Sequence, residues 1–209
     1  VSSMSKNGID IKVDLTVTSE KVTIGTKTTT TYTTKVSSVT IGGKATSTVT
    51  NTLNLKTSAN IPVTKIADGI AANTFTFGLK DVTANIDSLV DQADSKITLK
   101  GSTNLAEQAL AASDDTVTIN VADSTSAQQS ASGEFAFDYA PTAPEETHWY
   151  AIAEQPGSTA GVVYDTTAYL VKITTTLSDD GRSLATTQTV YKTTSDSNEL
   201  QEVTGEIGA

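Results

Sequence analysis

Strict alternation of apolar and polar residues along extended stretches is the feature that most constrains the fold of this chain. The clearest stretch is "IDIKVDLTV", residues 9–17, where isoleucine, valine and leucine alternate with aspartate, lysine and threonine. A period of two is typical of a β-strand with one face in water. About one residue in five is threonine, and β-branched side chains favour the pleated, half-exposed surface of a sheet. The sequence therefore predicts an all-β protein.

The same pattern divides the chain into two blocks. Residues 1–57 are predicted to be a β-rich N-terminal segment, either the end of a preceding domain or a donor-strand region. Residues 58–209 are predicted to form one β domain, with one or two short helices within 85–113, where apolar spacing and helix-forming residues replace the alternation. Strands are predicted at 9–17, 20–25, 31–41, 45–55, around Lys65, and at 74–82, 115–123, 134–140, 148–154, 167–177 and 183–191, with a hairpin turn at 42–43 and a polar loop at 124–133.

Composition excludes several classes of function. The chain has 209 residues, a formal net charge of −10 and a pI of about 4.4, so nucleic-acid phosphates and anionic membranes would repel it. No apolar run is long enough to span a membrane and no secretory leader opens the sequence. The chain has no cysteine and a single histidine, which excludes disulfides, thiolate catalysis and multi-histidine metal sites. We therefore expect no metal, no cofactor and no enzymatic turnover.

Three polar residues occupy positions where the alternation predicts an apolar side chain. Taken singly, each has an ordinary interpretation, because a lysine can extend to water, a carboxylate at a strand end can reach solvent and an asparagine can bond the backbone. The three are Lys65, in register with Ile61 and Val63; Glu154, in register with Tyr150 and Ile152; and Asn51, in register with Val49 and Leu53.

Together these residue types suggest one reaction. Burial disfavours the charged forms of lysine and glutamate, so a buried pair can exist as a neutral amine and a neutral acid. The amine can attack a carboxamide that the acid polarises, release ammonia and leave an amide bond between two side chains. Such a link would restrict the unfolded chain as a disulfide does, by about 3–5 kcal/mol on that analogy. A chain without cysteine would gain much from it.

The residues of the second block resemble a known family. Three segments carry the resemblance over roughly 59–204: "IPVTKIADGIAANTFTFGL", "GEFAFDY", and "WYAIAEQPGSTAGVVYDTTAYLVKITTTLSDDGRSLATTQTVY". They are similar to the streptococcal-type pilin isopeptide linkage domain of Gram-positive backbone pilins. The resemblance implies an immunoglobulin-like β-sandwich in which Lys65 forms the amide and Glu154 is the acid that promotes it.

The partner asparagine does not follow from the resemblance. The family carries it in a final strand with an F-x-N-x-Y-like pattern, whereas this sequence continues as "SDSNELQEVTGEIGA", where Asn198 lies in a predicted polar turn. A stretch that resembles such a strand, "STVTNTLNL", instead surrounds Asn51, before Lys65. Asn51 can bond within a preceding domain while the partner of Lys65 lies beyond residue 209, can enter a neighbouring subunit in trans, or can fold back onto its own chain.

The resulting expectation is a structural subunit of a bacterial pilus or cell-surface filament, located outside the cell. Its partners would be further copies of itself, joined head to tail, with strand donation between subunits and residues 9–17 as a second donor candidate. No L-P-x-T-G sorting signal is present in the sequence. The alternative is a stalk or ligand-binding module of a cell-wall-anchored adhesin, with a host surface ligand as its partner.

Overall fold

The computed structural model describes residues 11–24, 27–41, 44–45, 55–93, 96–179, 181, 183–204 and 207–208. Its contacts divide the chain into two compact units, Val1–Asn54 and Leu55–Ala209. Within the described ranges, no helix has the length and hydrophobicity needed to cross a membrane.

The first unit is a long antiparallel ribbon. Strand β1 (Ile11–Ile24) pairs along its whole length with β2 (Lys27–Ile41), and the short β3 (Lys44–Ala45) adds to the end of β2. The predicted strands 9–17 and 20–25 are thus parts of one strand where the structure describes them, because the two polar residues between them, Thr18 and Ser19, stay paired with Thr33 and Tyr32 of β2. The turn predicted at 42–43 and most of the strand predicted at 45–55 lie outside the described residues.

One face of this ribbon is apolar and uncovered within its own unit. Leu15 pairs with Val36, and Val17 lies two residues further along the same face. These three side chains are more than half exposed, as is Tyr32. Two strands alone bury little surface and are marginally stable in water, so this face is suited to contact with another polypeptide segment.

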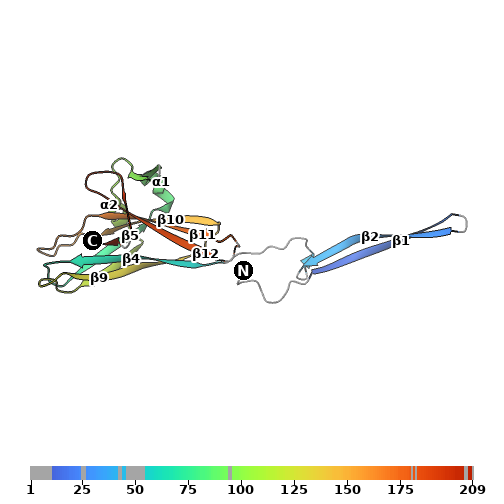
Figure 1. Ribbon diagram of the computed structural model, residues 1–209, viewed down its shortest axis with the longest axis horizontal. Coiled ribbons are helices and arrows are strands. Elements are labelled where there is room, and N and C mark those ends of the chain that lie inside the picture. Colours follow the sequence, from blue (N-terminus) through green and yellow to red (C-terminus); the bar gives the residue numbers. More distant parts are fainter. Residues whose placement is uncertain are drawn as a thin grey trace. The chain divides into compact units, whose positions relative to one another are not determined.

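The second unit is a β-sandwich, which confirms the predicted all-β fold (Figure 1). A six-stranded sheet has the order β13-β12-β11-β10-β5-β8, and a three-stranded sheet has the order β14-β4-β9. The strands are β4 (Thr57–Ala67), β5 (Asn73–Asp81), β8 (Asp115–Val121), β9 (Gln129–Tyr139), β10 (Glu145–Glu154), β11 (Ala168–Leu177), β12 (Leu184–Lys192), β13 (Gln201–Val203) and β14 (Ile207–Gly208).

The main core lies between these two layers. Alternate residues of each strand point inward, so that Ile61 and Val63 of β4 meet Phe77 of β5 and Phe135 of β9, all fully buried. Strand β9 begins at Gln129, inside the stretch 124–133 that the sequence predicts to be a loop. This prediction was wrong there because small polar residues can still form ladder hydrogen bonds, and residues 129–133 pair with the second half of β4.

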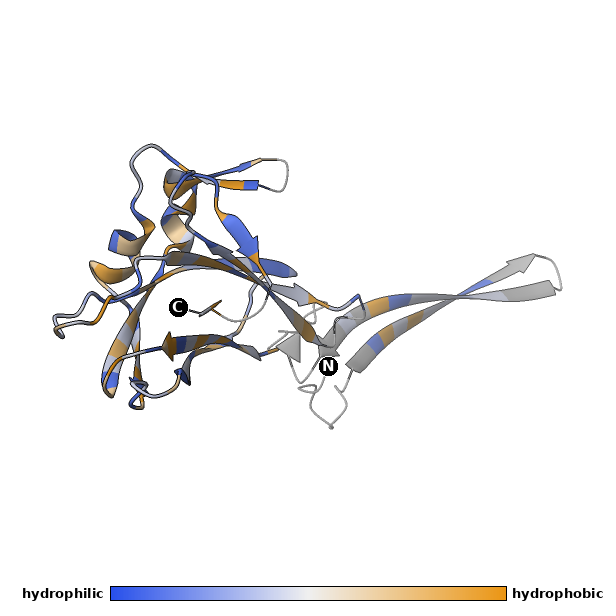
Figure 2. Ribbon diagram, turned by 60° about the vertical axis from the view of Figure 1, so that its left-hand side comes forward, coloured by the Kyte–Doolittle hydropathy of each residue, from blue (hydrophilic) through white to orange (hydrophobic). Residues whose placement is uncertain are grey.

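A second apolar cluster lies on the outer face of the six-stranded sheet. Short helices and a hairpin cover that face, and Figure 2 shows hydrophobic residues both on the strands and on these helices. The side chain of Asn104 begins α2 by accepting hydrogen bonds from the backbone N–H groups of Ala106 and Glu107. The covering elements are η1 (Thr83–Asn85), α1 (Ile86–Leu89), β6 (Val90–Ala93), β7 (Lys96–Leu99) and α2 (Leu105–Leu110).

These elements confirm the prediction of short helices within 85–113, but α1 is only four residues long. From Val90 the chain is extended, and it returns as β7 to form the β6–β7 hairpin. The apolar residues Val90 and Ile97 of this hairpin are buried against the sheet, so tertiary packing rather than helix propensity decides the conformation.

The last described residues form a strand that the sequence pattern does not indicate. Ile207 pairs in parallel with Val63, and Gly208 with Thr64, so β14 lies along β4 in the same direction. Ile207 is fully buried. The Tyr169 hydroxyl donates a hydrogen bond to the carbonyl oxygen of Gly208 and so joins β14 to the opposite sheet.

Candidate functional site

Lys65 lies inside the sandwich, as the alternation along β4 predicts. It follows Ile61 and Val63 on the inward face and is 5% exposed. Its ammonium nitrogen lies 2.8 Å from Oε2 of Glu154 and 4.6 Å from the centre of the Phe75 ring. A buried charge is costly unless it is paired, and the Glu154 carboxylate and the Phe75 ring both stabilise the Lys65 ammonium.

Glu154 is the last residue of β10, in the opposite sheet. It pairs with Phe77 of β5 and is 3% exposed. Its Oε2 accepts hydrogen bonds from the Lys65 ammonium and, at 3.3 Å, from the backbone N–H of Asp165. Its Oε1 is buried and has no hydrogen-bond partner within the described part of the chain. Leaving such an atom unsatisfied costs about 1–3 kcal/mol, so this oxygen marks a position for a further polar group.

The loop 155–167 positions the N–H group that contacts Glu154. The Asp165 carboxylate accepts hydrogen bonds from the backbone N–H and the hydroxyl of Thr167, which fixes the turn that aims the Asp165 N–H at Glu154. Beside it, the Tyr164 ring packs at 5.7 Å from the Phe75 ring, the same ring that Lys65 contacts.

Tyr164 is held by polar contacts as well as by packing. Its hydroxyl accepts a hydrogen bond from the Asn73 amide, and the bonds from Thr159 and Asn73 lower its pKa from the ordinary value. A Cβ added to Gly157 would lie 2.1 Å from the Tyr164 ring. A larger residue at this position would therefore force the Tyr164 ring or the loop to move.

A small cavity opens beside Lys65, at the end of β4. Its volume is about 190 Å³. Phe75 forms one wall and the loop residues Gly161 and Val162 form another. The cavity provides space beside Lys65 for part of another side chain.

The sequence-predicted residues are brought together only in part. Lys65 and Glu154 form one site, whereas Asn51 lies outside the described residues. Asn198 is placed elsewhere: its carbonyl oxygen accepts a hydrogen bond from the Leu99 N–H, on the hairpin side of the six-stranded sheet. The roles of Tyr164, Asp165 and Tyr169 were not recognised from the sequence, although the "YDTTAY" segment that contains them carried part of the family resemblance.

His148 lies in β10, within an aromatic cluster. Its ring packs 4.8 Å from the Tyr139 ring, and its Nε2 lies 3.9 Å from Oε2 of Glu146. The hydroxyls of Tyr139 and Tyr150 share a hydrogen bond of 3.0 Å, and burial raises the pKa of both tyrosines. Among the described residues, no group of three or more His, Cys, Asp or Glu side chains could hold a metal ion.

Comparison with known proteins identifies the family of the second unit. Residues 58–202 match the family model FctA, described as the Spy0128-like isopeptide containing domain. No curated protein matches the chain. The family match covers both strands that supply Lys65 and Glu154, and it confirms the resemblance to the pilin isopeptide domain. The chain belongs to the FctA family of Spy0128-like isopeptide-containing domains.

Proposed function

We propose that this protein is a structural subunit of a bacterial surface filament, in which Lys65 forms an amide bond with an asparagine side chain and Glu154 promotes the reaction. The FctA family is a pilin-type structural family, which supports a location at the cell surface and association with further copies of the same protein. Our proposal goes beyond the family assignment because it names the amide bond and the residues of this chain that would form it.

One observation carries the proposal. Oε1 of Glu154 is buried without a partner, while Oε2 of the same carboxylate holds the Lys65 ammonium at 2.8 Å. A buried ion pair is more stable when both carboxylate oxygens are hydrogen-bonded, because an unsatisfied buried acceptor is costly. A carboxamide placed next to Lys65 would provide the missing partner.

The proposed reaction needs no cofactor. Lys65 transfers a proton to Glu154 along their hydrogen bond, which leaves a neutral amine and a neutral carboxylic acid. The acid donates a hydrogen bond to the carbonyl oxygen of the asparagine, and the amine nitrogen attacks the carbonyl carbon. The new C–N bond forms as the bond to the amide nitrogen breaks, and that nitrogen leaves as ammonia with a proton from the attacking nitrogen. The product removes both charges from the interior.

The register of β14 supports a specific approach of the asparagine. Because Ile207 lies opposite Val63 and Gly208 opposite Thr64, the next position of a strand in this register lies opposite Lys65. Side chains of a strand alternate, so that position and the second one after it face the core as Ile207 does. We propose that the carboxamide belongs to one of these two positions, beside the 190 Å³ cavity. In this chain the residue after Gly208 is Ala209, so an asparagine delivered in cis would occupy the second of the two positions, whereas a donated strand could place one at either.

Two sources can supply this strand. A segment that follows β14 in the chain would deliver the asparagine in cis. A neighbouring subunit that inserts the segment around Asn51 would deliver it in trans and join subunits head to tail, a form of β-strand addition. The uncovered apolar face of β1 and β2, with Leu15, Val17 and Val36 exposed, supports a role of the first unit in contacts between subunits.

Intact mass spectrometry of the full-length protein tests the proposal. One amide bond lowers the mass by one ammonia, and proteolysis then yields a branched peptide that contains Lys65 and identifies its partner. A branch to Asn51 together with multimers that resist boiling in detergent indicates bonding in trans, whereas a monomer that has lost ammonia indicates bonding in cis. The proposal is contradicted if the full-length protein has the mass calculated from its sequence, with no loss of ammonia, and yields a linear Lys65 peptide.

The alternative function, a stalk or ligand-binding module of an adhesin, is supported by a different observation. The outer face of the six-stranded sheet contains a second, larger cavity, which is unrelated to Lys65.

A further inference from the structure

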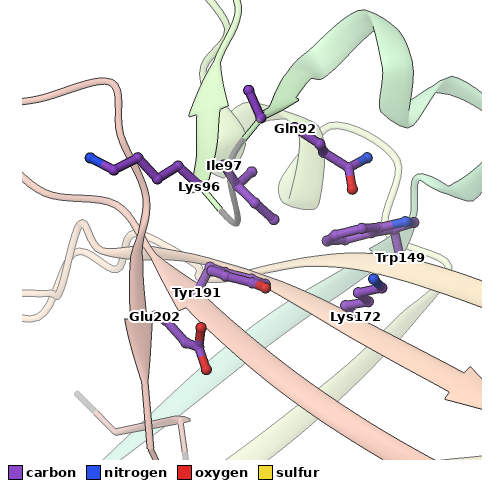
Figure 3. Close-up of a pocket in the computed structure, with 8 residues that line it drawn as sticks. Gln92, Lys96, Ile97, Trp149, Lys172, Tyr191 and Glu202 are labelled. Carbon is purple, nitrogen blue, oxygen red and sulfur yellow. The ribbon is translucent and has the colours of Figure 1, made fainter.

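The larger cavity lies between the β6–β7 hairpin and the outer face of the six-stranded sheet (Figure 3). Its volume is about 360 Å³, within the range of sites that bind small molecules. Adjacent strands supply its floor through Trp149 of β10, Lys172 of β11 and Tyr191 of β12, and Glu202 of β13 closes one end. The hairpin supplies the opposite wall.

Hydrogen bonds fix the hairpin above this floor. The Leu99 N–H donates to the carbonyl of Asn198, and the Leu200 N–H donates to the carbonyl of Ile97, both at 2.8 Å. Lys96 adds an ion pair with Glu199 at 3.0 Å. These contacts join the hairpin to the segment that leads into β13, so the walls of the cavity are held together by backbone bonds rather than by a ligand.

The floor is aromatic: Tyr191 is partly exposed, and Trp149 beside it is 4% exposed. The rings of Trp149 and Tyr191 lie 6.4 Å apart at 30°, and Ile97 approaches from the hairpin side (Figure 3). The Lys172 ammonium lies 5.4 Å from the centre of the Trp149 ring. Aromatic rings of this kind pack against apolar faces of ligands while polar groups beside them set the orientation.

The polar groups around this surface are available for hydrogen bonding. Within the described part of the chain, the side chains of Gln92, Lys172 and Glu202 form no hydrogen bond and no ion pair, in contrast to Lys96. The ammonium group is a donor, the carboxylate an acceptor and the amide is both. A ligand in this cavity therefore meets donors and acceptors around an aromatic floor.

The balance of charge selects the class of ligand. Lys172 and Glu202 place one positive and one negative charge in the same cavity, so a ligand with a single charge gains attraction from one of them and repulsion from the other. A neutral ring that bears several hydroxyl groups can donate to Glu202, accept from Lys172 and lay its C–H face on Tyr191. We propose that this cavity is a binding site for a neutral saccharide.

The protein contains a single tryptophan, so its fluorescence and its indole NMR signal report directly on the cavity. The test titrates the full-length protein with the methyl glycosides of glucose, galactose, mannose and N-acetylglucosamine. We expect at least one of them to shift the Trp149 signals in a saturable way. Glu202→Ala and Lys172→Met should each weaken that binding about 2- to 10-fold, the usual effect of one lost hydrogen bond.

Matched controls separate binding from general effects of charge. Glu107→Ala removes an exposed carboxylate on α2, and Lys56→Met removes an exposed ammonium before β4, both outside the cavity; neither should change the affinity. Butylammonium and acetate serve as charged probes. The proposal is overturned if none of the four glycosides shifts the Trp149 signals, if a charged probe binds more tightly than every glycoside, or if the control variants weaken binding as much as the cavity variants.

Discussion

The ammonium nitrogen of Lys65 lies 2.8 Å from Oε2 of Glu154, although 89 positions separate the two residues in the chain. Lys65 belongs to the three-stranded sheet and Glu154 to the six-stranded sheet, so the pair bridges the two layers of the sandwich. The pair is buried and incompletely hydrogen-bonded, which is a costly arrangement for stability alone and a suitable one for a reaction that removes both charges.

Replacement of Glu154 should prevent the amide bond without preventing folding. Glu154→Ala removes the proton acceptor and donor of the proposed reaction, and general acid–base groups of this kind contribute about 10²- to 10⁴-fold to a rate. Intact mass spectrometry over time should show a variant whose mass is not lowered by the loss of ammonia. The control is Glu134→Ala, which removes an exposed carboxylate bonded to Asn60 and should leave the bond formation unchanged. A Glu154→Ala variant that forms the bond at the original rate would contradict the role of the acid.

Replacement of both members of the pair should be less harmful than replacement of one. Lys65→Met leaves a buried carboxylate alone and Glu154→Met leaves a buried ammonium alone, each at a cost of about 3–5 kcal/mol. The two variants with Lys65→Met lack the amine and Glu154→Met lacks the acid that promotes the reaction, so the comparison reports on the pair alone once intact mass spectrometry shows that Glu154→Met has not lost ammonia. We expect Lys65→Met/Glu154→Met to unfold at a higher guanidinium concentration than either single variant. A double variant as unstable as the sum of the two singles would show that the pair is not coupled.

Gly157→Ala should destabilise the loop that covers Glu154. The added Cβ would lie 2.1 Å from the Tyr164 ring, which forces one of the two to move at a cost of about 1–3 kcal/mol. The Lys65 amine should then react faster with an amine-acylating reagent, measured by peptide mass spectrometry. In a Tyr164→Ala background the obstacle is gone, so Gly157→Ala should add no further cost there. If Gly157→Ala lowers the free energy of unfolding equally with Tyr164 and with Tyr164→Ala, the contact between residue 157 and the Tyr164 ring does not cause the loss.

Alkaline pH should weaken the sandwich in part through Tyr169. Burial, followed by the charges of Asp165 and Glu154, raises its pKa to about 12, above the ordinary value of about 10. Because the pKa is raised in the folded protein, the contribution of Tyr169 to the free energy of unfolding is complete below about pH 10, where its hydroxyl is protonated in both the folded and the unfolded protein. This contribution is lost as the pH rises to about 12. Guanidinium unfolding across this window should show a steeper fall for the original protein than for Tyr169→Phe.

The Tyr169→Phe variant should retain part of the fall in stability, because burial raises the pKa of Tyr139 and Tyr150 as well. At neutral pH it should also be less stable, because it loses the hydrogen bond to the carbonyl of Gly208. Identical pH profiles for the two proteins would indicate that Tyr169 ionises freely in the folded state.

Period-two alternation was sufficient to predict the all-β fold and the inward direction of Lys65 and Glu154, whereas the β-sandwich was implied by the family resemblance. Alternation depends only on the geometry of an extended backbone, in which successive side chains point to opposite faces. It fails where pairing is set by distant segments. Residues 129–133 form part of β9 because β4 offers its edge, and Ile207 forms a strand because Val63 lies beside it; neither partner is visible in the local sequence.

The sequence by itself determined the fold class, the family and the two residue types that can form an amide, because all three are written in residue order and spacing. Only the tertiary structure decided that Lys65 and Glu154 meet across the two sheets, that one carboxylate oxygen stays without a described partner, and that the β6–β7 hairpin encloses a cavity over Trp149 and Tyr191. The physical reason is that these contacts join residues far apart in the chain. Their distances depend on how whole layers pack, which no local pattern of residues specifies.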